Sequence, residues 1–325
     1  MKKIRNNLIF ILIIIVIYLL FTFNLPYYIE GPGGLININD RYKVENEYKV
    51  KGSLNMTYVS EYKATIPFYI YSKLNKDYDI YKKETIIPSN ETEKDSNFRG
   101  KIMLKEATDN AIIIAYQKAG KTCEIISSKI VIIYIDENAR TNLKIGDEII
   151  SVNDTEVSNK AELKKIISNY NVGDKIIFKV KTKENKIKEK YGYLNSDKVV
   201  GILFSYDRKL VTNPNIEIQS EKDEYGPSGG LITTLSIYNK LVKEDITHGK
   251  KISGTGTIEE DGTVGEIDGV KYKLKGAVKN KADVFLVPAG NYKEAQKIKD
   301  KYNYNIKIVK VKNIDDALEY LKKEE

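Results

Sequence analysis

The sequence predicts an α+β protein that begins with a transmembrane helix and continues into at least two domains. Residues 6–29 carry no charge, and segments rich in Ile, Val and Tyr recur through the rest of the chain. Strand-like and helix-like segments then alternate regularly over residues 283–322. About 300 residues follow the apolar segment, which is more than one hydrophobic core usually holds. A hydrophobic content of 42% argues against a disordered chain.

The N-terminal segment has the length and flanking charges of a membrane anchor. Residues 8–25 are almost entirely Ile, Leu, Val, Phe and Tyr, which is about enough to cross a hydrocarbon core as a helix. Lys2, Lys3 and Arg5 precede this segment, so residues 1–7 are expected to be cytoplasmic and the rest of the chain extracellular. A cleaved signal peptide is the alternative, but no small-x-small cleavage site follows.

Composition limits the classes of cofactor and partner. Cys123 is the only cysteine, so an internal disulfide is impossible. His248 is the only histidine and lies in a polar, loop-like stretch, so we expect a surface residue and neither a zinc site nor another metal site or cofactor. The net charge is +8, but acidic residues are interspersed among the lysines, and no nucleic-acid-binding stripe is expected.

A serine lies in a glycine-rich segment at the start of a predicted helix. Ser228 is preceded by Gly226 and Pro227 and followed by two glycines, which allow a sharp bend and close approach of a substrate. A helical repeat of apolar residues begins at Leu231, so Ser228 lies at or just before a helix N-terminus. Free backbone N–H groups there could stabilise an oxyanion. A turn with a capping serine is the alternative interpretation.

A lysine lies at the edge of the apolar face of a second predicted helix, residues 269–280. Val270, Leu274 and Ala277 share one arc of this helix, and Lys273 borders that arc, whereas three other lysines share a solvated face. Partial desolvation would lower the pKa of Lys273, as a lysine general base requires. The alternative is a lysine whose stem packs while its ammonium reaches water.

These two segments together resemble the proteolytic domain of the Lon family. In that family a serine in a Gly-Pro-Ser-small-Gly segment pairs with a lysine in a Gly-Gly-hydrophobic-x-x-Lys segment, and Ser228 and Lys273 match those positions. The resemblance also implies that Thr255 orients the lysine. The sequence departs from the family pattern at three positions: Tyr225, Gly229 in place of alanine, and Asp268 in place of the first glycine of the lysine motif.

Residues 126–195 resemble a PDZ domain of the bacterial protease type. Residues 143–153 match the signature Leu-x-x-Gly-Asp-x-Ile-x-x-Val-Asn, and a helix is expected over residues 159–168. PDZ domains take up an extended peptide as an added strand. The resemblance places this groove between the strand 130–135 and the helix, and its expected peptide-binding residues are Ile130, Ile132, Ile135, Leu163 and Ile167. A packing domain that binds no peptide is the alternative.

The resemblance extends over nearly the whole chain, to membrane-anchored, PDZ-containing Lon-like proteases of Gram-positive bacteria. It implies that residues 26–125, with a helix near 105–118, form a membrane-proximal α+β region that is part of the protease module. The PDZ domain would then be inserted into that module or docked beside it, and residues 196–325 would form the Lon-like proteolytic domain. Over the last part of the chain we expect strands at 283–287 and 305–311 and helices at 291–302 and 315–322.

The implied function is that of an ATP-independent extracytoplasmic serine endopeptidase, since nothing in the sequence encodes an ATPase. Ser228 would attack the scissile bond, Lys273 would act as the base, and the backbone around Gly226, Pro227 and Gly229 would bind the oxyanion. The implied substrates are peptides or unfolded protein segments, and a homo-oligomer is implied by analogy alone. The alternatives are a non-catalytic PDZ adaptor on a retained protease scaffold and a Ser-His hydrolase that uses His248.

Overall fold

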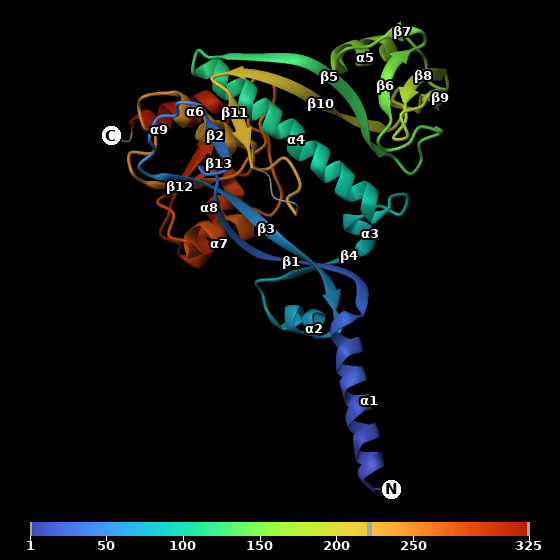
Figure 1. Cartoon of the computed structure of the whole chain (residues 1–325), viewed down its shortest axis with the longest axis vertical. Helices are drawn as coiled ribbons and strands as arrows, with labels where there is room; N and C mark the ends of the chain where they lie inside the picture. The colour runs from blue at the N-terminus through green and yellow to red at the C-terminus, as the bar shows by residue number, and fades with distance from the viewer. Residues whose placement is uncertain (1, 220–222, 324–325) are drawn as a thin grey trace.

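The fold consists of one projecting helix, a larger body and a smaller domain (Figure 1). The computed structural model describes residues 2–219 and 223–323. The body and the smaller domain are each built on a six-stranded sheet. This mixture of helices and strands, with an apolar helix at the N-terminus, confirms the predicted fold class.

The N-terminal helix α1 (Lys2–Thr22) extends away from the body with its apolar side chains exposed (Figure 1). Its length and composition would allow it to cross a membrane. The helix starts and ends earlier than the predicted range 8–25, because Asn24 already pairs with Thr65 as the first residue of strand β1 (Asn24–Asn37). One residue, Phe23, therefore separates the helix from the central sheet.

The large sheet combines strands from both ends of the chain. Its order is β14 (Lys307–Val311), β13 (Val284–Pro288), β12 (Lys251–Gly254), β3 (Ser53–Thr65), β1 and β4 (Asp79–Lys82). Strand β12 runs parallel to both β3 and β13, whereas β1 is antiparallel to its neighbours β3 and β4. The pairing of β3 with β12 places the membrane-proximal part of the chain beside the segment that contains Thr255.

Helices cover both faces of this sheet. The helices α4 (Glu93–Lys118), α6 (Gly230–Leu241) and α9 (Ile314–Lys323) cover one face, and α7 (Val270–Lys279) and α8 (Tyr292–Tyr302) cover the other. The side chains of β13 alternate between the two faces of the sheet. Val284 and Leu286 belong to the core under α4, α6 and α9, and Phe285 and Val287 belong to the core under α7 and α8. This two-residue alternation is that of a strand buried on both sides. The predicted strand–helix alternation of the C-terminal part is confirmed.

The smaller domain is an antiparallel sheet of order β10 (Ile202–Asn213), β5 (Thr122–Ile135), β6 (Glu148–Val152), β8 (Lys175–Lys181) and β9 (Ile187–Tyr193). The short strand β7 (Thr155–Glu156) pairs with β6, and α5 (Lys160–Ser168) packs on the sheet through the buried Leu163. Strands β5 and β10 pair from Ile135 and Ile202 to Thr122 and Asn213. They form a ribbon through which the chain enters and leaves the smaller domain (Figure 1).

The long helix α4 lies along this ribbon and also packs against α6. It begins at Glu93, well before the predicted start near residue 105, because Thr92 and Asp95 form a capping box that starts the helix in a polar segment. The remaining elements of the body are short: α2 (Ile66–Leu74), α3 (Lys83–Ile86), and the pair β2 (Tyr42–Val44) and β11 (Ile216–Ile218). Helix α4 therefore connects the ribbon with the segment that carries Ser228.

Candidate active site

The loop that carries Ser228 is held at both of its ends. Gly226 adopts a left-handed conformation with φ of 87°, which favours glycine, and its N–H donates to the carbonyl of Gly100 on α4 at 2.9 Å. The carbonyl of Ser228 accepts the N–H of Gly256 at 2.8 Å and the hydroxyl of Thr255 at 3.0 Å. The half-buried serine is thus fixed between α4 and the end of β12.

Ser228 lies just before the N-terminus of α6, as predicted, since the helix begins at Gly230. Within the described residues, the amides of Ser228 and Gly229 have no recorded intramolecular acceptor. The oxyanion prediction needs correction at the other two positions, because the N–H of Gly226 is already bound to Gly100 and Pro227 has no N–H. Two adjacent N–H groups at a helix N-terminus therefore remain as oxyanion donors.

Close packing explains why two glycines follow the serine. A Cβ at Gly229 would lie 2.1 Å from the sulfur of Met56 on β3, and a Cβ at Gly230 would lie 2.9 Å from the backbone nitrogen of Ile258. The methionine side chain is flexible and could move, but the backbone of Ile258 could not. This chain has glycine at position 229, where the Lon family usually has alanine, and Met56 occupies the space that the alanine methyl group would need.

Helix α7 carries Lys273 into the interior. The helix begins at Val270, one residue after the predicted start, and follows Gly269 with φ of 74°. It packs against β1, β3 and β12, so Lys273 is only 4% exposed. Burial lowers the pKa of Lys273 to about 8, and Asp268 and Glu30 act in the opposite direction. The lysine amine is therefore much closer to neutrality near pH 8 than an exposed lysine would be.

Acidic residues surround the lysine on the sheet side. Glu30 on β1 lies opposite Glu61 on β3 and opposite Asp79 on β4 in the strand register. Burial raises the pKa of Glu30, and the charges of Glu61, Asp268 and Asp79 raise it further. The hydroxyl of Tyr272 donates to Asp79, which connects α7 to this acidic row. Glu30 is separated from Lys273 by more than 240 residues of sequence, and no local pattern pointed to it.

The serine loop and the lysine helix rest on the same strand. Met56 on β3 contacts the position of Gly229, and Val59, three residues further along β3, lies 2.6 Å from the position of a Cβ on Gly269. Within the described residues, no recorded hydrogen bond joins the side chains of Ser228 and Lys273. The hydroxyl of Thr255 binds the serine carbonyl, whereas the resemblance implied that it orients the lysine. The structure therefore connects Thr255 with the serine side of the site.

A cavity of about 530 Å³ lies next to the serine loop. Leu104 and Thr108 of α4 line it together with Arg41 and Glu224, which form an ion pair. A much smaller adjoining cavity is lined by Pro227 and Gly229 themselves, and also by Leu104 and Thr108. The larger cavity therefore reaches the serine loop at Glu224, and the smaller one reaches the residues on either side of Ser228. No group of three or more potential metal ligands occurs in the same described ranges.

The predicted peptide-binding residues of the smaller domain lie in different environments. Ile130, Ile132 and Leu163 are buried in its core, and Ile135 and Ile167 pack against that core while remaining partly exposed. Strand β5, which carries the three predicted isoleucines, is paired with β10 on one side and with β6 on the other. It therefore has no free edge for an added strand, and the predicted position of the groove is wrong in this respect.

Strand β10 is one of the two edge strands of this sheet, and β9 is the other. Strand β10 lies beside α5, because the N–H of Lys160 donates to the hydroxyl of Tyr206 at 2.7 Å and the ammonium of Lys160 lies over the Tyr206 ring. Glu106 of α4 contacts both Lys160 and Ser205. A peptide added at this edge would thus extend toward α4 and the body. Strand β10 begins at Ile202, more than 60 residues after the strand 130–135 that was predicted to form the groove.

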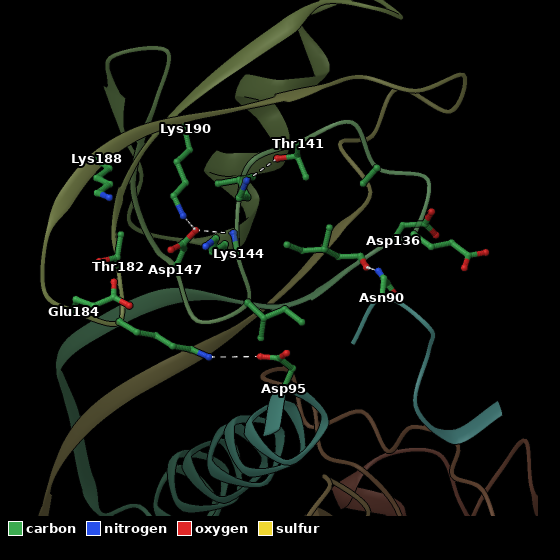
Figure 2. Close-up of a pocket in the computed structure, with 16 residues that line it drawn as sticks. Asn90, Asp95, Asp136, Thr141, Lys144, Asp147, Thr182, Glu184, Lys188 and Lys190 are labelled. Atoms are coloured by element: carbon green, nitrogen blue, oxygen red, sulfur yellow. Dashed lines mark hydrogen bonds and ion pairs between the residues drawn. The ribbon is translucent and has the colours of Figure 1, made fainter. Parts of the chain in front are cut away.

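A second cavity, of about 560 Å³, lies where the smaller domain meets the body (Figure 2). Asn90 donates to the carbonyl of Ile135 at 2.7 Å, and Lys183 lies 3.7 Å from Asp95 at the start of α4. Figure 2 also shows Lys190 pointing toward Asp147 within the domain. No residue of the serine loop lines this cavity. Its contacts fix the orientation of the domain and do not belong to the candidate active site.

Comparison with known families identifies two domain types in this chain. Residues 209–323 match the family described as Lon protease (S16) C-terminal proteolytic domain, and this range contains Ser228, Thr255 and Lys273. Residues 95–189 match the PDZ domain family. A Lon-type proteolytic domain and a PDZ domain are therefore present in this chain.

Parts of this chain are also similar to individual proteins. The chain is 31% identical to a Lon protease of Neorickettsia sennetsu over 120 residues, which cover 36% of this chain and 14% of that protein. It is 32% identical to a Lon protease of Trichlorobacter lovleyi over 93 residues, which cover 29% of this chain and 11% of that protein. A segment of 40 residues is 52% identical to chloroplastic Protease Do-like 8 of Arabidopsis thaliana and covers 12% of this chain and 9% of that protein. The chain thus spans a small fraction of each relative.

Proposed function

We propose that this protein is an ATP-independent serine endopeptidase in which Ser228 and Lys273 form the catalytic dyad. The observation that carries the proposal is a lysine that is 4% exposed, with a pKa of about 8, on a helix that shares its supporting strand with the serine loop. A buried amine that loses its proton near neutral pH is suited to accept the proton of a serine hydroxyl. The match to a Lon-type proteolytic domain supports the same chemistry.

In the proposed mechanism, the Ser228 hydroxyl attacks the scissile carbonyl while the neutral Lys273 amine takes the hydroxyl proton. The amides of Ser228 and Gly229 stabilise the oxyanion of the tetrahedral intermediate. Lys273 then gives its proton to the leaving amine, and water hydrolyses the acyl-enzyme with the lysine acting again as base. The hydrogen bond from Thr255 to the Ser228 carbonyl holds the loop in place during these steps.

We further propose that α1 anchors the enzyme and that the catalytic body lies outside the membrane. Three positive residues precede the apolar segment, which favours a cytoplasmic N-terminus. No nucleotide hydrolysis would then be available to unfold substrates, so short, extended or already unfolded segments are the proposed substrates. The cavity of about 530 Å³ beside the serine loop is the proposed position for a substrate side chain.

A test of the proposal uses the full-length protein in detergent with unfolded casein and with a fluorophosphonate probe that labels reactive serines. Wild-type protein is expected to cleave casein and to be labelled. Ser228→Ala is expected to lose labelling and to lose cleavage by about a thousandfold or more, because the nucleophile is absent. Ser236→Ala, in the middle of α6, is the matched serine control. Labelling that persists in Ser228→Ala would rule out Ser228 as the nucleophile.

A second candidate function is a non-catalytic adaptor, which the free edge of β10 beside α5 favours. In that case the PDZ domain would bind partner segments as an added strand, and the protease fold would serve as a scaffold. The same casein and probe experiment separates the two candidates, because an adaptor would neither react with the probe nor digest casein.

The pH dependence of cleavage should follow the lysine. Only the neutral amine accepts a proton, so kcat/KM is expected to rise with pH through a midpoint near 8. Glu30 raises the pKa of Lys273, so Glu30→Gln should lower that pKa and move the midpoint to lower pH. Glu156→Gln, at an exposed position on β7, should leave the profile unchanged. A Glu30→Gln midpoint that moves upward or stays fixed would contradict this electrostatic coupling.

His248 is not expected to take part in catalysis. It follows the C-terminal end of α6, and Ser228 precedes the N-terminal end, so the length of the helix, about 18 Å, separates them. The Nε2 atom of His248 lies 3.1 Å from the carbonyl of Leu321 on α9. His248→Ala should therefore change kcat/KM by less than about twofold. A loss of activity comparable to that of Ser228→Ala would instead support a Ser-His hydrolase.

A further inference from the structure

Helix α2 has an apolar face that the rest of the protein leaves uncovered. Ile70 is 55% exposed, Tyr71 is 51% exposed and Leu74 is 82% exposed. At 100° per residue these three side chains lie within one arc of about 100°, whereas the buried Ser72 lies on the opposite side. A helix on a water-exposed surface normally places polar residues on its outer face. Helix α2 instead places apolar residues on its outer face.

Helix α2 lies at the level where α1 ends. Thr65, the residue just before α2, pairs directly with Asn24, which is the first residue of β1 after α1. The two helices are in contact, and Figure 1 shows α2 beside the upper end of α1 and below the sheet. Phe23, which joins α1 to β1, is 59% exposed at the same level. A membrane that α1 crosses would therefore have its surface at α2.

Aromatic side chains are concentrated around α2. The ring centroids of Tyr27 and Tyr69 are 5.0 Å apart, and those of Phe68 and Tyr62 are 5.4 Å apart. The Tyr71 ring contacts Tyr78 at 5.7 Å. Tyrosine is enriched at both surfaces of membranes because its ring is apolar and its hydroxyl is wet. The ammonium of Lys73 lies over the Tyr69 ring at the edge of the apolar face, where it can reach lipid headgroups.

We propose that α2 lies in the interface of the outer leaflet, with Ile70, Tyr71 and Leu74 inserted among the lipids. The inference rests on the proposed crossing of the membrane by α1 and is independent of the proposed catalytic dyad. A lipid surface is the occupant that these observations favour, because the uncovered face belongs to a helix in contact with α1, whose exposed apolar side chains would allow it to cross a membrane. Helix α2 and α1 would together hold the body at two points and prevent it from tilting.

The chain contains no tryptophan, so a single introduced tryptophan reports on one position without background. The experiment uses the full-length protein with Leu74→Trp, or with Ile70→Trp as a second variant, in vesicles of phosphatidylcholine and phosphatidylglycerol. Bromine atoms on the acyl chains quench tryptophan that lies in the bilayer. Val172→Trp, at a position 55% exposed in the smaller domain, is the matched aqueous control, and Phe10→Trp in the middle of α1 reports on the anchor.

The proposal expects blue-shifted emission and loss of emission in brominated vesicles for Leu74→Trp and Ile70→Trp, with full emission for Val172→Trp. Quenching of Phe10→Trp without quenching at either α2 position would overturn the proposal while leaving the anchor intact. Blue-shifted emission that bromine does not quench would overturn it in favour of a second copy or another protein on this face. If Phe10→Trp is not quenched, α1 does not cross the membrane, and the proposals for α1 and for α2 are both overturned. The casein experiment would still test the proposed catalytic dyad independently.

Discussion

Replacing Lys273 with methionine is expected to abolish cleavage and, at the same time, to stabilise the fold. Cleavage should fall by about a thousandfold or more, because methionine cannot accept the proton of the serine hydroxyl. The fold should gain stability because methionine fills the same space without a buried charge. A fall in the pKa of Lys273 from 10.5 to about 8 corresponds to an upper figure of about 3 kcal/mol for that charge at pH 7.

The gain in stability of Lys273→Met is expected to depend on pH. The pKa of Lys273 is lower in the folded protein than in the unfolded chain, so the unfolded state binds more protons between pH 8 and pH 10.5, and the stability of the wild type rises over that interval. The stability gain of Lys273→Met should therefore be largest at pH 7 and should shrink toward pH 10. Thermal unfolding of both proteins at several pH values measures this difference.

Lys279→Met is the matched control, since Lys279 lies on the same helix but is exposed. It should change neither cleavage nor the pH dependence of stability. Retention of cleavage in Lys273→Met would refute the assignment of the base. A stability difference that does not vary with pH would show that Lys273 is not a strained, buried ammonium at neutral pH.

Replacing Lys190 with methionine is expected to destabilise the PDZ domain by about 3–5 kcal/mol, the typical result of removing one partner of a buried ion pair. The Nζ atom of Lys190 lies 2.5 Å from the carboxylate of Asp147, and both side chains are less than 10% exposed. The carboxylate also accepts the N–H of Lys144 at 2.7 Å, so it cannot turn to solvent without breaking that bond. Removal of Lys190 leaves a buried negative charge unpaired.

Thermal unfolding and amide hydrogen exchange of the PDZ strands measure this loss. The double variant Asp147→Asn with Lys190→Met should recover most of it, because the amide oxygen still accepts the Lys144 N–H and no charge remains buried. Lys188→Met, on the same strand but at an exposed position, should have little effect. A double variant as unstable as Lys190→Met would show that lost packing, and not the unpaired charge, causes the destabilisation.

Local sequence patterns predicted the helices and motifs well. The helix that carries Lys273 begins one residue after the predicted start and ends one residue before the predicted end, because its apolar arc and the preceding glycine are local signals. The position of Ser228 before α6 was predicted for the same reason. The early start of α4 was missed, since its first turns are polar and its capping box uses an aspartate in place of the usual Glu or Gln.

Contacts between distant segments could not be predicted from local patterns. The neighbours of Lys273 on β1, above all Glu30, depend on the pairing of β1 with β3 and on the packing of α7 across them. The edge position of β10 depends on a strand that returns after the whole PDZ domain has been formed, and this is why the predicted groove was placed on β5. The hydrogen bond from the Thr255 hydroxyl to the Ser228 carbonyl likewise depends on the packing of the serine loop against the end of β12.

The absence of a linker between α1 and β1 has a consequence for which bonds the enzyme can reach. Six residues of strand separate Asn24 from Glu30, which corresponds to about 20 Å at the usual rise of a strand. Lys273 is electrostatically coupled to Glu30, so a membrane crossed by α1 would keep the proposed catalytic lysine at a constant distance of roughly that size from the membrane surface. The protein would then cleave only peptide bonds that lie at this distance from the membrane surface. Substrates anchored in the same bilayer would reach it by lateral diffusion.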